Sequence, residues 1–354
     1  MPKIVNAALL TDQLQSLRRK VDFDTFDVLL QQLLTMIASD SIKVAPAYQR
    51  QFRWDETRCS QLIESIFLGI PVPSLFMATN EDGTWELVDG VQRVSAIVKF
   101  CGDKDLRAKM NLNGPLTLTG LEKLDQFNNL RFFDLPSSVK LQFHTRPLKI
   151  VTLSDKSDAV VRFDLFERLN RGGVSLTDQE IRDCVFRGPF ADLLEKLAKD
   201  QNFDQVVRLT AQQKRDGTKE ECVLRFFAFL ERYKKFVHSV REFLNDFMEE
   251  SRATFDPVKG EKIFRDTFLQ LATVLPDGIV RPGKYKRDTT PLNFFEGVAV
   301  GAALAIKQAG KLRGGNPYKW MGSDELRKTT TGATNNPSAV KGRIEYCRDH
   351  FLGK

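Results

Sequence analysis

The stretch Glu86-Leu87-Val88-Asp89-Gly90-Val91-Gln92-Arg93 decides the fold of the first part of the chain. It predicts a short apolar strand, a turn and the first turn of a helix that ends at Gly102. Helix N-termini expose unpaired backbone N–H groups and a positive dipole end, so they attract phosphate groups. Gly90 lets the backbone approach a ligand closely, and Arg93 adds a forked cationic donor.

Asp89 has more than one interpretation. Its carboxylate could ligate a metal ion, position a water molecule or cap the following helix. A strand, an Asp-Gly turn and a helix also follow one another in many proteins that bind no ligand at this place. If that holds here, Arg93 is a cation on a solvated face of the helix. The turn holds too few glycines for a P-loop or a dinucleotide fingerprint. The rest of the chain must decide between a phosphate site and a structural turn.

Helices and strands alternate around this turn. Residues 26–38 have one apolar helical face, with Asp24 or Thr25 as the cap, and Asp55 is placed to cap a second helix that Gly69 ends. Strands are expected at 42–44, 72–78, 84–88 and 148–153, and buried anchors at Phe132, Phe133 and Leu135. This order predicts an α+β domain.

The second half of the chain has an almost wholly helical pattern. Thr177 and Glu180 have the spacing of a capping box. Helices are expected at 190–199, 219–237, 239–250, 261–274, 292–309 and 337–351. The domains expected from sequence are residues 1–185 and a helical, basic part at 186–354.

Composition limits the class of protein. The chain has 354 residues, of which 42% are hydrophobic, and no run long enough to span a membrane. Its start lacks the apolar core of a signal peptide, and its five cysteines form no C-x-x-C pair. We therefore expect a cytoplasmic protein with no membrane association and no structural zinc.

The net charge of +7 is unevenly distributed. Residues 281–354 contain 14 Lys and Arg against 6 Asp and Glu, so this last fifth carries the whole basic excess. Such asymmetry favours a polyanionic partner such as DNA, although solubility alone would also explain it.

Three motifs occur in a definite order along the first half. They are Tyr48-Gln49-Arg50 with Trp54, the Asp89–Arg93 turn, and the run Phe166–Gly173 with Leu176 and Glu180. Together they resemble the GmrSD N-terminal-domain family of bacterial restriction and anti-phage proteins, whose core is similar to the ParB/sulfiredoxin fold. The family signature is an Asp-Gly-Gln-Gln-Arg turn, and Val91 replaces its first glutamine here.

The resemblance implies binding of an NTP and its hydrolysis with Mg²⁺, in control of a nuclease. It assigns catalytic roles to Asp89, Gln92 and Arg93, with Asp89 also ligating the metal through water. The nucleotide would in addition contact Gly90 and residues of the other two motifs. In the first motif these are Tyr48, Gln49 and Arg50. In the third they are Asn170, Arg171, Gly172 and Gly173. Which nucleotide is bound stays open.

Several of these residues have an ordinary structural alternative. Arg50 could pair with Asp55 or Glu56 on the surface, and Trp54 could dock a helix. Glu180 is a natural cap rather than a base, and Asn170-Arg171-Gly172-Gly173 is typical of a helix C-terminus.

Common nuclease signatures are missing from the sequence. The three histidines, His144, His238 and His350, lie far apart, no glutamate is followed two positions later by lysine, and no His-x-Lys pair occurs. This favours a regulatory or sensing component that acts with a separately encoded nuclease. Whether the chain forms a homo-oligomer stays open.

The leading hypothesis is a nucleotide-binding, NTP-hydrolysing component of a restriction or phage-defence system that contacts DNA through its basic helical part. The alternatives are a non-catalytic DNA-binding or regulatory module, a ParB-like metal-dependent nuclease that uses Asp89, and a protein-interaction subunit with a degenerate pocket.

Overall fold

The computed structural model describes residues 12, 23–44, 54–80, 82–154, 163–165, 167–168, 177–283, 288–313 and 315–354. The chain divides into two compact units, Met1–Ser175 (unit 1) and Leu176–Lys354 (unit 2). The boundary expected from sequence, 185/186, lies within unit 2, where the helix Asp178–Val185 (α9) contacts two later helices of that unit.

Unit 1 is built on a five-stranded mixed sheet with the order β1-β5-β3-β4-β2. The β1 strand pairs antiparallel with β5, and β3 pairs antiparallel with β4, whereas β3 with β5 and β2 with β4 are parallel pairs. The strands are β1 (Phe23–Leu29), β2 (Ile42–Lys43), β3 (Leu75–Thr79), β4 (Trp85–Asp89) and β5 (Pro147–Leu153).

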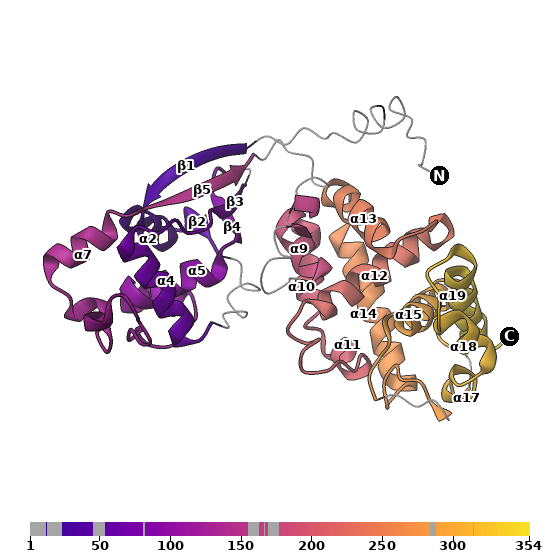
Figure 1. The fold of residues 1–354 in the computed structure, drawn as a ribbon. Helices are drawn as coiled ribbons and strands as arrows, with labels where there is room; N and C mark the ends of the chain where they lie inside the picture. Colours follow the sequence, from indigo (N-terminus) through magenta and orange to yellow (C-terminus); the bar gives the residue numbers. More distant parts are fainter. Residues whose placement is uncertain are drawn as a thin grey trace, which may run out of the picture. The chain divides into compact units, whose positions relative to one another are not determined.

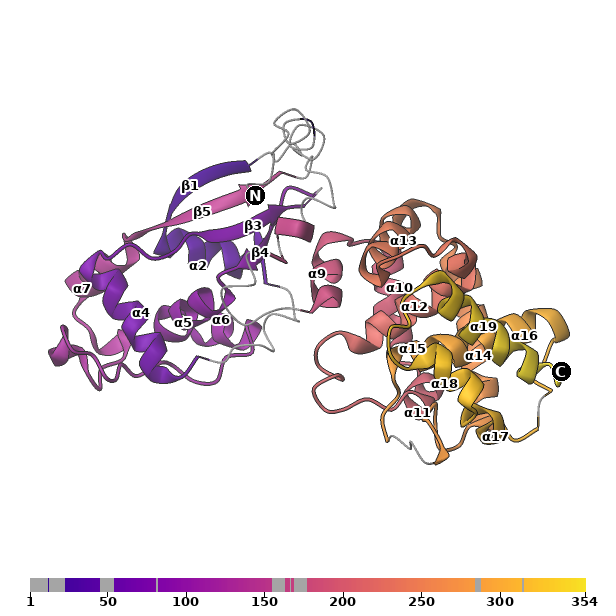
Figure 2. The ribbon, with the colours of Figure 1, turned by 45° about the vertical axis from the view of Figure 1, so that its right-hand side comes forward.

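The helices of unit 1 bury their apolar faces against this sheet. Figures 1 and 2 both show α2, α4 and α5 on the same side of it. The helices are α2 (Leu30–Ala38), α4 (Glu56–Leu68), α5 (Val91–Cys101), α6 (Lys104–Lys109) and α7 (Ser137–His144), and two 3-10 turns, η1 (Asp125–Phe127) and η2 (Phe132–Asp134), lie between α6 and α7. The expected inward residues of α5, Val94, Ile97, Val98 and Cys101, are all buried. The sequence patterning of this helix is therefore confirmed.

The predicted limits of α4 are also confirmed. The carboxylate of Asp55 accepts a hydrogen bond from the backbone N–H of Arg58 at 2.7 Å, as an N-cap does. Gly69 ends the helix in the left-handed region, with φ of 71°.

Two expectations for unit 1 are wrong. Residues 23–29 form β1 rather than the start of a helix, so Asp24 and Thr25 are strand residues and not caps. All seven residues of β1 pair with β5, and this long-range pairing outweighs the local helical pattern. Phe133 is exposed rather than a buried anchor, whereas Phe132 and Leu135 are buried.

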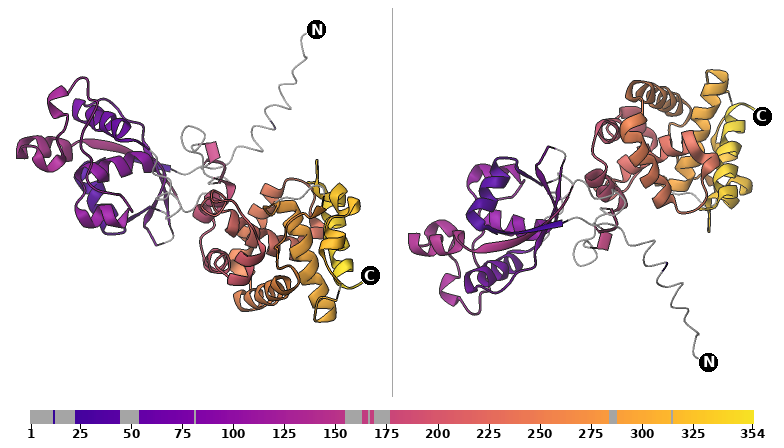
Figure 3. Two further views of the ribbon diagram at one scale, coloured as in Figure 1. Left: turned by 90° about the horizontal axis from the view of Figure 1, so that it is seen from below. Right: turned by 90° about the horizontal axis from the view of Figure 1, so that it is seen from above.

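In unit 2 the described residues form helices and connecting segments, as Figure 3 shows. The expected helices are found as α10 (Pro189–Leu197), α12 (Thr218–Arg232), α13 (Val240–Thr254), α14 (Pro257–Val274), the continuous α15 (Leu292–Phe295), η5 (Glu296–Val300, a π-helix) and α16 (Gly301–Ala309), and α19 (Pro337–Phe351). Three short helices were not expected: α11 (Gln201–Val206), α17 (Tyr318–Met321) and α18 (Asp324–Thr330). The 3-10 turn η3 (Tyr233–Lys235) forms the last part of the helix expected at 219–237. The α+β class with a helical second part is confirmed.

Phenylalanine rings fill the core of unit 2. Phe264 lies 4.3 Å from Phe268 and 5.4 Å from Phe226, measured between ring centroids, and all three are fully buried. Tilted and edge-on ring pairs of this kind add to the area that they bury. Among the helices of the described residues, none is both long and apolar enough to cross a membrane.

Candidate functional site

The turn between β4 and α5 requires glycine at position 90. Gly90 has φ of 107°, a region that residues with a side chain rarely adopt. A Cβ atom at this position would lie 2.3 Å from Cδ2 of the buried Leu75. Both the backbone angle and the close packing therefore fix the direction in which the strand enters the helix.

Arg93 holds this turn together. Its Nη1 donates to the backbone oxygens of Pro73 and of Ser74, the latter at 3.1 Å, and its Nη2 forms an ion pair with Oδ2 of Asp89 at 2.6 Å. The Arg93 side chain is only 12% exposed. In the structure its guanidinium thus ties the residues before β3 to the end of β4, instead of extending into solvent as a free clamp.

Asp89 faces outward more than its partner does. Its side chain is 34% exposed, and only Oδ2 accepts from Arg93. Within the described residues, no hydrogen bond reaches Oδ1. One carboxylate together with the phosphates of a nucleotide is a common way to bind Mg²⁺, which keeps several of its waters. The single carboxylate is a donor that suits a magnesium ion bound together with a nucleotide. Among the residues described, no three His, Cys, Asp or Glu side chains gather.

Trp54, the one described residue of the first predicted motif, lies next to the Asp89–Arg93 turn. Oε1 of Gln92 accepts a hydrogen bond from the backbone N–H of Trp54 at 3.3 Å, and this contact joins the start of α5 to the residues that lead into α4. The guanidinium of Arg58 lies 4.8 Å from the Trp54 ring centroid. Gly90, the N-cap of α5, has no side chain to accept from the first N–H groups of that helix.

The remaining predicted residues lie outside the part of the chain that the structure describes. They are Tyr48, Gln49, Arg50, Asn170, Arg171, Gly172 and Gly173. Their place in the site stays a prediction. Asp89, Gly90, Gln92 and Arg93 are therefore the predicted residues that the structure brings together.

Sequence reasoning missed Glu86, a buried carboxylate three residues before Asp89. Glu86 is 1% exposed, and its register partners are Lys43 on β2 and Ala78 on β3. It is the one charged residue among Trp85, Glu86, Leu87 and Val88, the part of β4 that precedes Asp89. That break in the pattern was the available signal.

Comparison with known families assigns this part of the chain. Residues 30–187 match the family described as the GmrSD restriction endonuclease, N-terminal domain. This region of the chain is similar to that domain over 158 residues. The match includes the β3–β4 hairpin, the Asp89–Arg93 turn and α5, so the site described above lies inside the matched region.

Other comparisons add little. One solved structure, the C2221 form of a Pnob8-like ParB-N domain, is 13% identical in sequence, and the alignment covers 94% of this chain and 97% of that one. Its TM-score is 0.23, too low to carry an argument about fold or function, so the ParB/sulfiredoxin-like description of the core stays a prediction. No curated protein matches the chain.

The last helix of the GmrSD match, α9, is anchored in unit 2. The capping box at its start is confirmed: Oγ1 of Thr177 accepts from the Glu180 N–H at 3.2 Å, and Oε2 of Glu180 accepts from the Thr177 N–H at 2.8 Å. From the same helix, the buried Arg182 donates to Asn245 on α13 at 2.8 Å and forms an ion pair with Glu221 on α12 at 3.4 Å.

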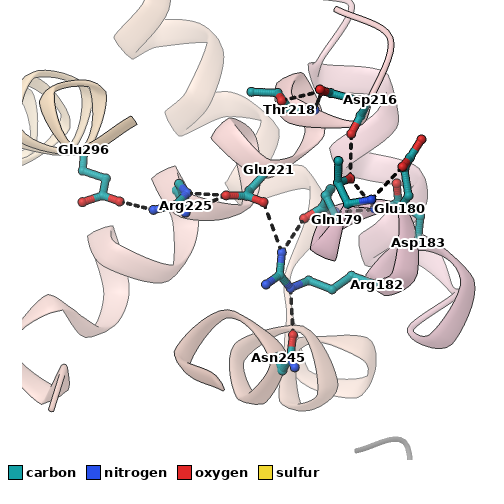
Figure 4. Close-up of polar contacts among 11 residues, drawn as sticks. Gln179, Glu180, Arg182, Asp183, Asp216, Thr218, Glu221, Arg225, Asn245 and Glu296 are labelled. Carbon is teal, nitrogen blue, oxygen red and sulfur yellow. Dashed lines mark hydrogen bonds and ion pairs between the residues drawn. The ribbon is translucent and has the colours of Figure 1, made fainter. Parts of the chain in front are cut away.

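The ion pairs continue through unit 2 (Figure 4). Glu221 also pairs with Arg225 at 2.6 Å, and Arg225 pairs with Glu296 at the start of η5. The second oxygen of Glu296 accepts from Arg343 on α19. Burial would raise the pKa of Glu221, but the nearby charges of Arg225 and Arg182 outweigh it and hold that pKa below its usual value.

This row of alternating charges, Arg182–Glu221–Arg225–Glu296–Arg343, is called the ion-pair row below. Glu296 and Arg343 are 1% and 0% exposed, so the row packs helices and offers no room to a ligand. Gly301 supports this packing, because a Cβ atom there would lie 2.7 Å from Cβ of Cys347 on α19. Spacing along the chain does not connect Arg225 with Arg343, since the two are far apart in the sequence.

Proposed function

We propose that this protein is a nucleotide-binding component of a restriction or phage-defence system. In this proposal the Asp89–Arg93 turn binds the phosphates of an NTP with Mg²⁺, and the basic helical unit contacts DNA. The observation that carries the proposal is the partly exposed carboxylate of Asp89 at the start of α5, where Gly90 offers no side-chain cap, inside a region that matches the GmrSD restriction endonuclease N-terminal domain.

Each residue of the turn has a distinct role in the proposal. Gly90 allows the phosphates to approach the first N–H groups of α5, and Asp89 orients the hydrated Mg²⁺. Arg93 is a positioning residue, because it holds Asp89 and the backbone before β3 in place. Gln92 fixes the start of α5 to the backbone at Trp54. The bound magnesium would neutralise charge on the phosphate that is transferred.

Hydrolysis is tested by phosphate release from the full chain with each of the four NTPs across a range of Mg²⁺ concentrations. We expect release with at least one NTP. Asp89→Asn should lower it at least tenfold, because the group that orients the metal loses its charge. Arg93→Lys should raise the Mg²⁺ concentration needed for half-maximal rate, since lysine cannot hold Asp89 and two backbone oxygens at once.

A matched control is Arg107→Lys. Arg107 also lies in unit 1 and donates to a backbone oxygen, that of Gly102, at the other end of α5. It should leave the Mg²⁺ dependence unchanged. No phosphate release with any NTP, or equal effects of the two arginine variants, would contradict the enzymatic part of the proposal.

The second candidate is a DNA-binding module without turnover, favoured by the basic excess of residues 281–354. It predicts duplex affinity that falls steeply with salt, because each neutralised phosphate releases counterions. Duplex binding that survives Asp89→Asn, in a protein that releases no phosphate, would favour this candidate. Nicking of plasmid DNA in the presence of Mg²⁺ would instead point to a nuclease.

A further inference from the structure

The first strand of unit 1 presents an open and largely apolar edge. The sheet order β1-β5-β3-β4-β2 places β1 at one end (Figure 1), and among the described residues no strand lies on its other edge. Six of its seven residues are exposed. They include Phe23, Phe26 and Leu29, whose side chains are 58%, 40% and 42% exposed. A long apolar edge strand is a template for pairing with another strand.

The backbone groups of β1 alternate between β5 and the open edge. The N–H of Leu30 donates to the backbone oxygen of Arg146 at 3.0 Å, and this pair continues the register of β1 with β5. Hydrogen-bonded and non-hydrogen-bonded positions alternate in antiparallel pairs, so the even-numbered residues of β1 bond to β5. The odd-numbered residues therefore turn their N–H and C=O groups toward the open edge: Phe23, Thr25, Asp27 and Leu29.

The residues that usually protect a sheet edge are missing from β1. The sequence Phe23–Leu29 contains no lysine, proline or glycine, and all seven residues pair with β5 in succession. Its two charges are Asp24 and Asp27. Lys149 on β5 is the register partner of Asp27 and brings a positive charge to the same part of the sheet. The edge is therefore open to a strand that places no carboxylate opposite these two aspartates.

We infer that the open edge of β1 pairs with β1 of a second copy of this chain, antiparallel and centred on Phe26. This register overlaps the whole strand. Phe23 lies opposite Leu29 of the second copy, and Thr25 lies opposite Asp27. These four residues point toward the shared edge in both copies, so opposite residues exchange backbone hydrogen bonds. The inference goes beyond the proposed function and does not depend on the nucleotide site.

The sequence of β1 favours this register over its neighbours. With Phe26 at the centre no aspartate lies opposite an aspartate, because Asp24 faces Val28 and Asp27 faces Thr25. A register centred on Asp27 would place two carboxylates directly opposite each other, which destabilises a strand pair. A register centred on Thr25 overlaps less of the strand. Phe26 lies opposite its own copy at a non-hydrogen-bonded position, where side chains come closer together.

The pairing closes at two copies. Two-fold symmetry uses the open edge of β1 in both chains, and the strand at the opposite end of the sheet, β2, has only two residues. We therefore expect a dimer and not a fibre. The edge of one strand is small relative to a standard protein interface, so the dissociation constant should lie in the micromolar range.

Sedimentation equilibrium of the full chain over a concentration series measures the dimer. The mass should rise from 40.3 kDa toward twice that value. Thr25→Lys should tighten the dimer about threefold, because it places an ammonium group opposite Asp27 of the second copy. Thr25→Asp should weaken it about fivefold, because it places two carboxylates there. Net charge alone predicts the opposite signs, since the chain already carries +7.

A second arm tests the register by mild oxidation. Phe26→Cys places the thiols of two copies opposite each other, with Cα atoms about 4.5 Å apart, a separation that a disulfide spans. It should give a covalent dimer. Asp24→Cys is the matched control, because this cysteine lies opposite Val28 and not opposite its own copy. It should cross-link at least about tenfold more slowly.

Gln61 on α4 controls for added charge. Gln61→Lys and Gln61→Asp, at an exposed residue of the same unit, should each change the dissociation constant less than about twofold. A single-chain mass at every concentration would overturn the inference. Equal effects of the Thr25 and Gln61 substitutions, or equal cross-linking of the two cysteine variants, would also overturn it. None of these results bears on phosphate release at the Asp89 turn, so failure here is distinct from failure of the proposed nucleotide site.

Discussion

Two arginine–carboxylate pairs of the molecule differ in their surroundings more than in their chemistry. In unit 1, Arg93 and Asp89 are 12% and 34% exposed, and Asp89 keeps one oxygen without a hydrogen bond from the described residues. In unit 2, Arg343 and Glu296 are 0% and 1% exposed, and both oxygens of Glu296 accept from arginines.

The difference separates a ligand site from a structural element. A buried carboxylate that already has two cationic partners has neither space nor charge for a ligand, and its role is to hold helices together. A partly exposed carboxylate with one partner can still meet a hydrated metal. An arginine–carboxylate pair alone therefore indicates little about function. The exposure of its carboxylate decides whether the pair can bind a ligand.

The largest effect expected from this comparison is on stability. Glu296→Ala leaves two arginines, Arg225 and Arg343, without their shared partner in the interior, and should cost about 3–5 kcal/mol of unfolding free energy. Asp89→Ala removes a partly exposed pair and should cost about 1 kcal/mol or less. Urea unfolding followed by Trp320 fluorescence in a Trp54→Phe/Trp85→Phe background measures the first effect. The fluorescence of Trp54 and Trp85, both in unit 1, in a Trp320→Phe background measures the second.

Similar costs for the two substitutions would break the comparison. In that case the ion-pair row would not be the buried structural element that its low exposure indicates.

Gly90 tests how rigidly the turn is built. Gly90→Ala should destabilise unit 1 by about 2 kcal/mol or more, because it adds backbone strain and a clash with Leu75. Gly83→Ala is the control: Gly83 also has positive φ, 78°, but nothing lies within 4 Å of its Cβ position. It should cost about 1 kcal/mol, from the backbone angle alone. If the two changes cost the same, close packing at the turn contributes nothing.

Local signals predicted much of unit 1. The cap at Asp55, the helix end at Gly69 and the apolar face of α5 all follow from neighbouring residues, and the structure confirms them. The cap at Thr177, at the start of unit 2, is confirmed in the same way. Strand β1 could not be predicted in this way, because its partner β5 is more than 100 residues away and the sequence shows only a helical period.

At the candidate site, too, contacts between distant segments could not be predicted from the sequence. The sequence located the Asp89–Arg93 turn but not the carbonyl contacts of Arg93, which come from Pro73 and Ser74 on another segment. The ion-pair row could not be predicted from the sequence either, because its members come from four separate elements, α9, α12, η5 and α19. Pairing between distant charges is set by packing of the helices and not by spacing along the chain.

His144, which forms no ion pair within the described residues, should give the smallest of the expected effects on unfolding free energy. The Nε2 atom of His144 is buried without a hydrogen bond within the described residues, and its ring stacks on Phe132. Burial lowers the pKa of His144, so the unfolded chain takes up a proton more readily than the folded one. Stability should therefore be complete above the unfolded pKa of about 6.5 and fall as the pH drops through the folded pKa.

Urea unfolding at pH 7 and at pH 5 checks this expectation. The His144→Phe protein should lose less stability between the two than the wild type, whereas His238→Gln, a change at an exposed histidine, should behave like the wild type. An identical loss in all three proteins would show that His144 does not titrate in this window.

The most direct test of the central claim is binding of a non-hydrolysable NTP with Mg²⁺, measured by calorimetry on the full chain. The wild type should bind, and Asp89→Asn should weaken binding at least tenfold. Asp82→Asn, which changes an exposed aspartate of unit 1 paired with Lys43, should bind like the wild type. No binding by the wild type, or unchanged affinity in Asp89→Asn, would contradict the claim that the Asp89–Arg93 turn is a nucleotide site.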